Sequence, residues 1–423
     1  MFLIRHISEL ITCAGSAPRR GPDQRGVSVV RDGAVAADGE RIVYAGPDGG
    51  MPASCASAPG TQVIDGRGLS VVPGFVDGHT HAMFAGDRRG ELRRRLAGAT
   101  YAEIAAEGGG IVSTVRETRA ASEDDLVRGT QRRLAEMLAC GTTTAEIKSG
   151  YGLDLETELK MLRAIRRLAA LQPIDLTATF MGAHEIPLEY RERREDYVRL
   201  VIDRMIPAVA AEGLAEWCDV FCEAGVFTPQ ESARILQAGA AHGLKPRIHA
   251  DELGASGGSE VAGGVGARSA DHLIHVSDAG IRALREADAV ATLLPAAAFY
   301  LKLGRFAPAR ALIDAGVPVA VASDVNPGGG FSPSLPFAMT LACFGMGLTF
   351  EEALVAATIN AAYGLDRAST VGSLEAGKLM DAVVIAGDAI DLIRVGAPPI
   401  AGVVKRGTLA FRTSVLDPLI SAA

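Results

Sequence analysis

The sequence predicts an α/β protein, a (β/α)8 TIM barrel with a small β-sandwich-like domain built from both ends of the chain. Through the middle of the chain, short apolar runs alternate with helical patterns, which is typical of β/α units. Both ends instead contain short β-like runs separated by turns rich in Gly and Pro. We therefore expect a barrel over residues 71–374 and a β domain over 1–70 plus 375–423.

Eight apolar runs are expected to form the barrel strands. They cover residues 71–76, 143–147, 176–180, 217–221, 247–250, 269–273, 289–294 and 319–322. One connecting helix is clearly marked, because Asp154 stands at an N-cap position before apolar residues at three- and four-residue steps. These apolar residues are Leu155, Leu159, Leu162, Ile165 and Leu168.

Composition narrows the class of protein. Apolar residues make up 48% of the 423 positions, which is enough for a large core, and the net charge of −8 argues against a nucleic-acid partner. No apolar run is long enough for a membrane span, which needs about 18 residues. Six scattered cysteines without a CxxC pair indicate reduced thiols. With no signal-peptide pattern at the N-terminus, we expect a cytoplasmic protein.

Histidines and acidic residues recur where the expected strands end. His79 and His81 lie two apart, so in an extended segment both imidazoles point the same way and can bind one ion. Chemistry in this fold collects at the C-terminal ends of the strands. Imidazole and carboxylate ligands with an open position suit Zn²⁺, and Fe²⁺ is also compatible. The later strand ends carry His184, His249, His272 and Asp324.

These residues resemble the amidohydrolase superfamily. The resemblance rests on PGFVDGHTH at 73–81, GSLEAGK at 372–378 and the residues His249, His272 and Asp324. It implies that His79, His81, His249 and Asp324 hold a metal and that His272 assists catalysis. Members with two metals carry a carboxylated Lys at the end of strand four. The run at 217–223 has none, and Lys148 follows strand two, so we expect one divalent ion.

A finer resemblance, to the imidazolonepropionase family, covers most of the barrel. It rests on segments 84–88, 108–115, 146–152, 182–184, 249–252, 269–272 and 324–328. The family implies a homodimer and substrate contacts from Arg88, Tyr151, His184, Glu252, Asn326 and Gly328. At the next position, also expected to contact substrate, the family has Ser or Thr and this chain has Gly329. Backbone N–H groups of the glycine loop are expected to replace the lost hydroxyl.

The family implies a small-molecule substrate and a reaction. The ring of 4-imidazolone-5-propanoate is opened by water to N-formimidoyl-L-glutamate, a step in histidine degradation. Arg88 is expected to bind the propionate with two parallel hydrogen bonds. Asp324 is expected to accept the proton of the water, and His272 to stabilise the oxyanion. Asp324 or Glu252 then protonates the ring nitrogen, unless Glu252 only orients a ligand histidine.

Two other functions are compatible with the metal ligands alone. One is an aminohydrolase of the same superfamily that releases ammonia, which would lack Arg88 and the loop at 146–152. The other is a non-catalytic protein of the same fold, which would be expected to have lost ligands that this chain keeps. An ammonia assay and a metal measurement separate these cases.

Overall fold

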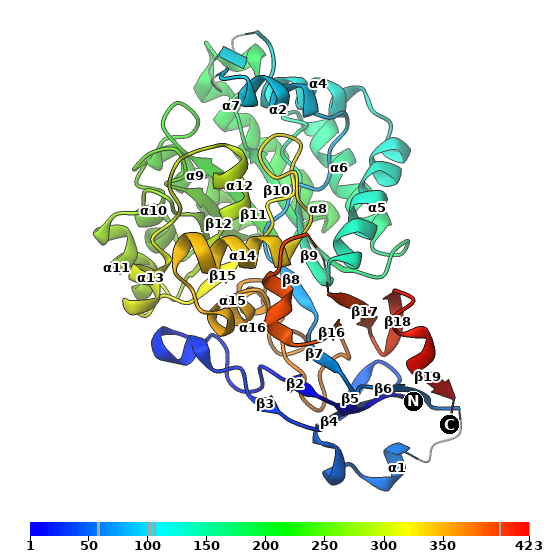
Figure 1. Ribbon diagram of the computed structural model, residues 1–423. Coiled ribbons are helices and arrows are strands. Elements are labelled where there is room, and N and C mark those ends of the chain that lie inside the picture. The colour runs from blue at the N-terminus through cyan, green and yellow to red at the C-terminus, as the bar shows by residue number, and fades with distance from the viewer. Residues whose placement is uncertain (57–59, 100–102, 105–106, 397–398, 423) are drawn as a thin grey trace.

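Eight parallel strands surround a barrel axis in sequence order (Figure 1). The computed structural model describes residues 1–56, 60–99, 103–104, 107–396 and 399–422. Every run expected as a barrel strand contributes one, so the (β/α)8 prediction is confirmed. The strands are β8 (Phe75–Asp77), β9 (Thr142–Lys148), β10 (Asp175–Ala183), β11 (Trp217–Cys222), β12 (Lys245–Ala250), β13 (Ser269–His272), β14 (Val290–Leu293) and β15 (Val319–Val321).

The barrel is closed just beyond the first and last strands. The sheet runs from β15 to β8, and backbone hydrogen bonds join the segments that follow these two strands. The N–H of Asp324 donates to the carbonyl of His79 at 3.1 Å, and the N–H of His81 donates to the carbonyl of Val325 at 2.8 Å. The segment His79–Thr80–His81, called the HxH segment below, therefore lies beside the segment that carries Asp324, because the barrel closes there.

Helices cover the outside of the barrel (Figure 1). The predicted helix is α6, whose first turn is capped by the Asp154 carboxylate accepting the Thr157 N–H at 2.7 Å. Its apolar residues Leu159, Leu162 and Ile165 are buried, as the spacing predicts. The described helices are α1 (Ala53–Ala56), α2 (Arg89–Leu96), α4 (Ile111–Ala120), α5 (Glu123–Ala139), α6 (Leu155–Leu168), α7 (Arg194–Leu200), α8 (Ile206–Glu212), α9 (Pro229–Ala241), α10 (Gly258–Val265), α11 (Asp278–Glu286), α12 (Pro295–Tyr300), α13 (Ala309–Asp314), α14 (Leu335–Met346), α15 (Phe350–Ala356) and α16 (Ile359–Gly364).

Two smaller sheets combine both ends of the chain. One has the order β19-β6-β1-β4-β5 and the other β18-β17-β16-β7-β2-β3. Residues such as Ile4, Val35, Val71 and Val384 form one buried cluster with members from both sheets, so the arrangement is sandwich-like. The strands are β1 (Phe2–Ile7), β2 (Glu9–Ile11), β3 (Val29–Val30), β4 (Gly33–Asp38), β5 (Arg41–Pro47), β6 (Gln62–Asp65), β7 (Leu69–Pro73), β16 (Ala382–Ala386), β17 (Ile400–Lys405), β18 (Thr408–Arg412) and β19 (Ile420–Ala422).

The run expected as one strand at 71–76 is two strands. β7 pairs with β16 in a small sheet, whereas β8 begins the barrel, and Gly74 separates them. A Cβ on Gly74 would lie 2.3 Å from Oγ1 of Thr143, so only glycine allows this close crossing. The limits of the two domains stay a prediction. Among the described helices, none is long and apolar enough to cross a membrane.

Candidate active site

A cavity of about 360 Å³ opens at the C-terminal ends of the barrel strands. It brings together residues that lie far apart in the sequence. The predicted site residues that line it are His81, Arg88, Tyr151, His184, His249, Glu252, His272, Asp324, Asn326, Gly328 and Gly329. His79, the remaining predicted residue, is fully buried against this cavity's floor, where its ring lies 4.5 Å from that of His249.

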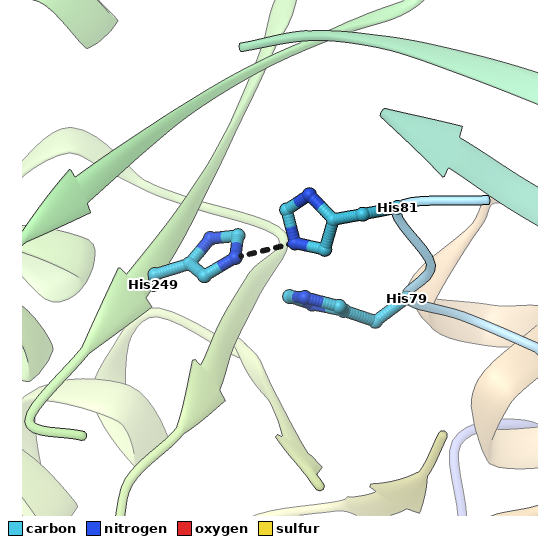
Figure 2. A group of neighbouring side chains, drawn as sticks. All are labelled: His79, His81 and His249. Atoms are coloured by element: carbon cyan, nitrogen blue, oxygen red, sulfur yellow. Dashed lines mark hydrogen bonds between the residues drawn. The ribbon is translucent and has the colours of Figure 1, made fainter. Parts of the chain in front are cut away.

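Three imidazoles, those of His79, His81 and His249, lie close together (Figure 2). His79 and His81 come from the segment after β8, and His249 comes from β12. One ring nitrogen from each lies within 4.8 Å of the other two. Oδ1 of Asp324 lies 3.7 Å from Nε2 of His79 and 3.8 Å from Nε2 of His81. The four predicted ligands are therefore in one place.

The donor atoms of this cluster fit a divalent cation. Nε2 of His79 and Oδ1 of Asp324 are buried and have no hydrogen-bond partner among the described residues. Nε2 of His81 and Nε2 of His249 approach to 3.1 Å. Burial lowers the pKa of His79 and of His81 well below the usual imidazole value, so both rings are neutral. Neutral imidazoles and a carboxylate with inward lone pairs are ligands for a metal such as zinc.

Two carboxylates orient the ligand histidines: Asp271, which the sequence places at a strand end without this role, and Asp219, which sequence reasoning missed. Nδ1 of His79 lies 2.6 Å from Oδ2 of Asp271, and Nδ1 of His249 lies 3.1 Å from Oδ1 of Asp219. A neutral ring that donates its Nδ1 proton to a carboxylate presents the Nε2 lone pair to a metal. The sequence carried a signal for Asp219, because this acidic residue interrupts the apolar run that forms β11.

His272 and Glu252 stand beside the metal-capable cluster. Nδ1 of His272 lies 3.6 Å from Oε1 of Glu252, too far for a hydrogen bond. Burial raises the pKa of Glu252 to about 8 and that of Asp324 to about 7. Carboxyl groups with pKa values raised toward neutrality are suited to general acid–base work. The group of converging donors consists of His79, His81 and His249, and the carboxylate of Asp324 lies within 3.8 Å of two of these rings, whereas Glu252 faces His272.

The loop that carries Tyr151 is held by a buried glutamate on α6. Glu158 accepts hydrogen bonds from the backbone N–H groups of Gly150 at 3.0 Å, Gly152 at 2.8 Å and Leu153 at 2.9 Å. Sequence reasoning missed Glu158, which looks like an ordinary helix residue next to apolar neighbours. Because three donors converge on one carboxylate, the loop has one conformation, and the buried Tyr151 ring is placed in the cavity wall.

His184 presents an acceptor to the cavity. Its Nδ1–H donates to the carbonyl of Gly150 at 3.0 Å, and burial lowers its pKa to about 3, so the ring is neutral. The other nitrogen, Nε2, then carries a lone pair. The ring stacks on that of His81 at 4.8 Å and lies 5.2 Å from that of Tyr151. A ligand N–H above the metal-capable cluster is the natural partner of this nitrogen.

Arg88 lies at the side of the cavity, held by one carboxylate. Its Nε and Nη2 atoms both lie 2.8 Å from Oε2 of Glu91, and Oε1 of Glu91 accepts the N–H of Gly110 at 2.8 Å. A Cβ at Gly328 would lie 2.3 Å from Nη1 of Arg88, so glycine allows the guanidinium to pack there. Glu91, which the sequence did not single out, thus leaves the Nη1–Nη2 edge of Arg88 to bind an anion.

The side chain of Asn326 binds the backbone of the glycine loop after Asp324. Oδ1 of Asn326 accepts the N–H of Gly328 at 2.8 Å and the N–H of Gly329 at 2.6 Å. Nδ2 of Asn326 donates to the carbonyl of Asp324 at 2.8 Å. Two of the N–H groups expected to replace the lost hydroxyl, those of Gly328 and Gly329, are therefore already bound by the Asn326 side chain, and the replacement stays a prediction. Asn326 lines the cavity, but its side chain first shapes the loop after Asp324.

Comparison with known proteins places the chain in a family. Residues 70–410 match the amidohydrolase family. An imidazolonepropionase of Symbiobacterium thermophilum is 51% identical over 410 residues, with 96% of each chain covered. An imidazolonepropionase of Myxococcus xanthus is 48% identical over 413 residues, with 97% of each chain covered.

Solved structures agree with this fold at much lower identity. Atrazine chlorohydrolase from Arthrobacter aurescens has a TM-score of 0.70 at 19% identity, covering 97% of this chain and 95% of its own. The ochratoxinase of A. niger has a TM-score of 0.69 at 18% identity, covering 98% and 96%. These likenesses show the barrel fold alone. The near-full-length identity to curated relatives shows more: the chain is an amidohydrolase and belongs to the imidazolonepropionase family.

Proposed function

We propose that this protein opens the ring of 4-imidazolone-5-propanoate with water to give N-formimidoyl-L-glutamate, a step of histidine degradation. One observation carries the proposal. A single cavity is lined by His81, His249 and Asp324, which cluster with the buried His79, and by Arg88, in a chain about half identical to curated imidazolonepropionases. The substrate combines a cyclic amide with a carboxylate tail, so it needs a metal site for the amide and a cation for the tail.

His79, His81, His249 and Asp324 would hold one divalent ion, Zn²⁺ or Fe²⁺. When bound, such an ion supplies a Lewis acid that polarises a carbonyl and acidifies water. Asp324 lines the cavity beside these histidines and is placed to accept the proton of the attacking water. His272 lies beside His249, with ring centroids 5.1 Å apart, and is placed to stabilise negative charge on the carbonyl oxygen.

The atoms balance in a simple way. The water oxygen bonds to the ring carbonyl carbon, the C–N bond of the cyclic amide breaks, and the nitrogen takes a proton. Asp324 or Glu252 can deliver that proton, since both carboxyls have raised pKa values and both line the cavity. The single product carries both a new carboxylate and a formimidoyl-substituted nitrogen. The reaction needs no oxidant and no co-substrate other than water.

The cavity wall supplies groups that match the rest of the substrate. The free edge of Arg88 can bind the propionate with two hydrogen bonds. Nε2 of His184 can accept a ring N–H, and Tyr151, Asn326 and Gly328 line the same space. Gly329 offers no side-chain hydroxyl where the family has one.

We further propose a cytoplasmic homodimer. All six cysteines of the chain are free, which suits a reducing compartment. The dimer is proposed from the family alone. Gel filtration with light scattering on the purified protein would check the assembly state.

A turnover assay tests the reaction. Purified protein should consume 4-imidazolone-5-propanoate, form N-formimidoyl-L-glutamate, release no ammonia, and lose activity after treatment with a chelator. Asp324→Asn should nearly abolish turnover, because it removes both a ligand and a proton acceptor. Ammonia release instead of ring opening would show an aminohydrolase, and turnover by fully metal-free protein would exclude the metal mechanism.

A further inference from the structure

A group of fully buried charged side chains lies directly beneath the ligand histidines. Nζ of Lys148, on β9, lies 2.7 Å from Oε1 of Glu146 and 2.7 Å from Oδ2 of Asp219. It also lies 3.9 Å from Oδ2 of Asp271. All four side chains have no exposed surface. Such a group is costly to bury, so its members must be mutually paired.

Each carboxylate around Lys148 also contacts either a ligand histidine or the backbone between His79 and His81. Asp219 bonds to His249 through its other oxygen, and Asp271 bonds to His79. Oε2 of Glu146 accepts the backbone N–H of Thr80 at 3.1 Å, and Thr80 stands between the two histidines of the HxH pair. One ammonium therefore connects to the carboxylates that hold the His79 and His249 rings and to the one that holds the backbone between His79 and His81.

The main chain strengthens this connection. The backbone N–H of Lys148 donates to the carbonyl of Thr80 at 3.0 Å, and the Thr80 hydroxyl donates to the carbonyl of Glu146 at 2.7 Å. β9 and the HxH segment are thus joined through side chains and backbone at the same place. A change in the position of the Lys148 ammonium would be transmitted directly to these contacts.

We propose that Lys148 is a positioning residue of the metal centre: its ammonium holds the carboxylates that orient the ligand histidines, and so sets metal affinity. The inference rests on the metal site proposed above. Lys148 touches none of the four ligand side chains at hydrogen-bonding distance in the described structure, and it acts through Asp219, Asp271 and Glu146.

Charge explains why a cation is needed there. Glu146, Asp219 and Asp271 bring three carboxylates into a fully buried region, and Lys148 and Arg247 are the cations beside them. Without Lys148, two carboxylates lose their nearest partner. A buried carboxylate that loses its partner is held less firmly and turns toward another donor or toward solvent. Asp219 would then no longer hold the Nδ1 proton of His249, and the ring would lose its orientation.

The chain offers a matched control at Lys405. Its ammonium is also buried and also lies between two carboxylates, at 2.8 Å from Asp175 and 2.6 Å from Asp381. Asp175 begins the nine-residue strand β10, so it lies at the opposite end of the barrel from the cavity. Lys405→Met removes the same chemical group at a similar side-chain burial, 3% exposed against 0% for Lys148, and away from the metal centre, although its partner Asp175 is one-third exposed.

The test is Zn²⁺ affinity, measured by competition with a chromophoric chelator, together with thermal unfolding of each metal-free protein. Lys148→Met should weaken Zn²⁺ binding clearly, by up to about 10- to 100-fold, which is the usual effect of losing a direct partner of a ligand histidine such as Asp219. Lys405→Met should lower the unfolding temperature as well but leave Zn²⁺ affinity near that of the wild type. Lys148→Gln, which keeps a donor for one carboxylate, serves if the Met variant does not fold, and it should show a smaller loss.

A double variant identifies the route. If Lys148 acts through Asp219, the affinity loss in Lys148→Met with Asp219→Asn should be clearly smaller than the two single losses combined. Wild-type Zn²⁺ affinity in the folded Lys148 variants would overturn the inference, and so would equal losses in the Lys148 and Lys405 variants. Absence of Zn²⁺ binding in the wild type would instead reject the metal site of the proposed function.

Discussion

Gly330 lies against the backbone of Asp324 so closely that a Cβ on Gly330 would stand 1.5 Å from the Asp324 carbonyl oxygen. The carbonyl of Gly330 also accepts the N–H of Asn326 at 3.0 Å. The loop after β15 therefore folds back onto the residue that is expected to bind metal, and glycine at 330 is a steric requirement. Gly329, one residue earlier, has no such constraint, because a Cβ there would meet the side chain of Leu301 at 3.2 Å.

The two neighbouring glycines should respond differently to substitution. Gly330→Ala should displace Asp324 and lose metal and activity together. Gly329→Ser should fold at a cost of about 1 kcal/mol or less, because Leu301 is only partly buried and Gly329 does not have a positive φ. The added hydroxyl should hold or lower KM, by up to roughly tenfold, since one hydrogen bond contributes about 0.5–1.5 kcal/mol. Metal analysis and steady-state kinetics check both variants; a fully active Gly330→Ala protein would contradict the steric argument.

Arg88 is expected to bind the carboxylate tail of the substrate. Arg88→Ala should retain its metal and lose about 10- to 100-fold in kcat/KM, mainly through KM, because a hydrogen bond to a charged group contributes about 1.5–3 kcal/mol. Arg88→Lys should not restore the loss, since Lys lacks the planar fork. Arg89→Ala is the control, because the neighbouring side chain of Arg89 is exposed and pairs with Asp87. Unchanged kinetics in Arg88→Ala would place the tail elsewhere.

The role of Glu252 can be read from pH dependence. Burial raises its pKa to about 8, so the carboxyl is protonated and can donate below that pH, and it is charged above it. A bound dication would move this midpoint downward, because a nearby positive charge favours the carboxylate. If the protonated form is the working form, kcat/KM falls as pH rises through the pKa.

Glu252→Gln tests this directly, since its amide donates at every pH. The variant should keep its metal and lose the alkaline fall in kcat/KM. Its turnover should drop strongly if Glu252 carries a proton and mildly if it only bonds the substrate. Loss of metal in Glu252→Gln would show that Glu252 is a ligand and would overturn the assignment of Asp324 as the fourth one.

The ligand set predicts about one divalent ion per chain, because three imidazoles and one carboxylate that converge on one place would hold one ion and are too few for two. Elemental analysis of purified protein should find this stoichiometry, and His249→Ala should lose metal and activity together. Affinity should fall as pH falls, since protons compete for the imidazole nitrogens. Two tightly bound ions per chain would contradict the mononuclear mechanism.

The sequence by itself indicated the fold and the residues that converge in the cavity. This succeeded because the pattern has a general physical basis: the C-terminal ends of parallel barrel strands meet at one face. Residues at those ends, such as His79, His184 and Asp324, therefore approach one another whatever the details of packing. The i, i+2 spacing of the HxH pair likewise follows from strand geometry alone.

Only the tertiary structure decided what supports those residues. Asp219 and Lys148 contact each other across two strands, and Glu158 reaches from a helix to the Tyr151 loop. Such partners depend on side-chain directions and on distances of a few ångströms, which no period in the sequence records. For the same reason the N–H of Gly329 looked free for a ligand, whereas in the folded chain it is bound by Asn326. Strand periodicity places a residue at a strand end, and only packing between elements determines which atom it meets there.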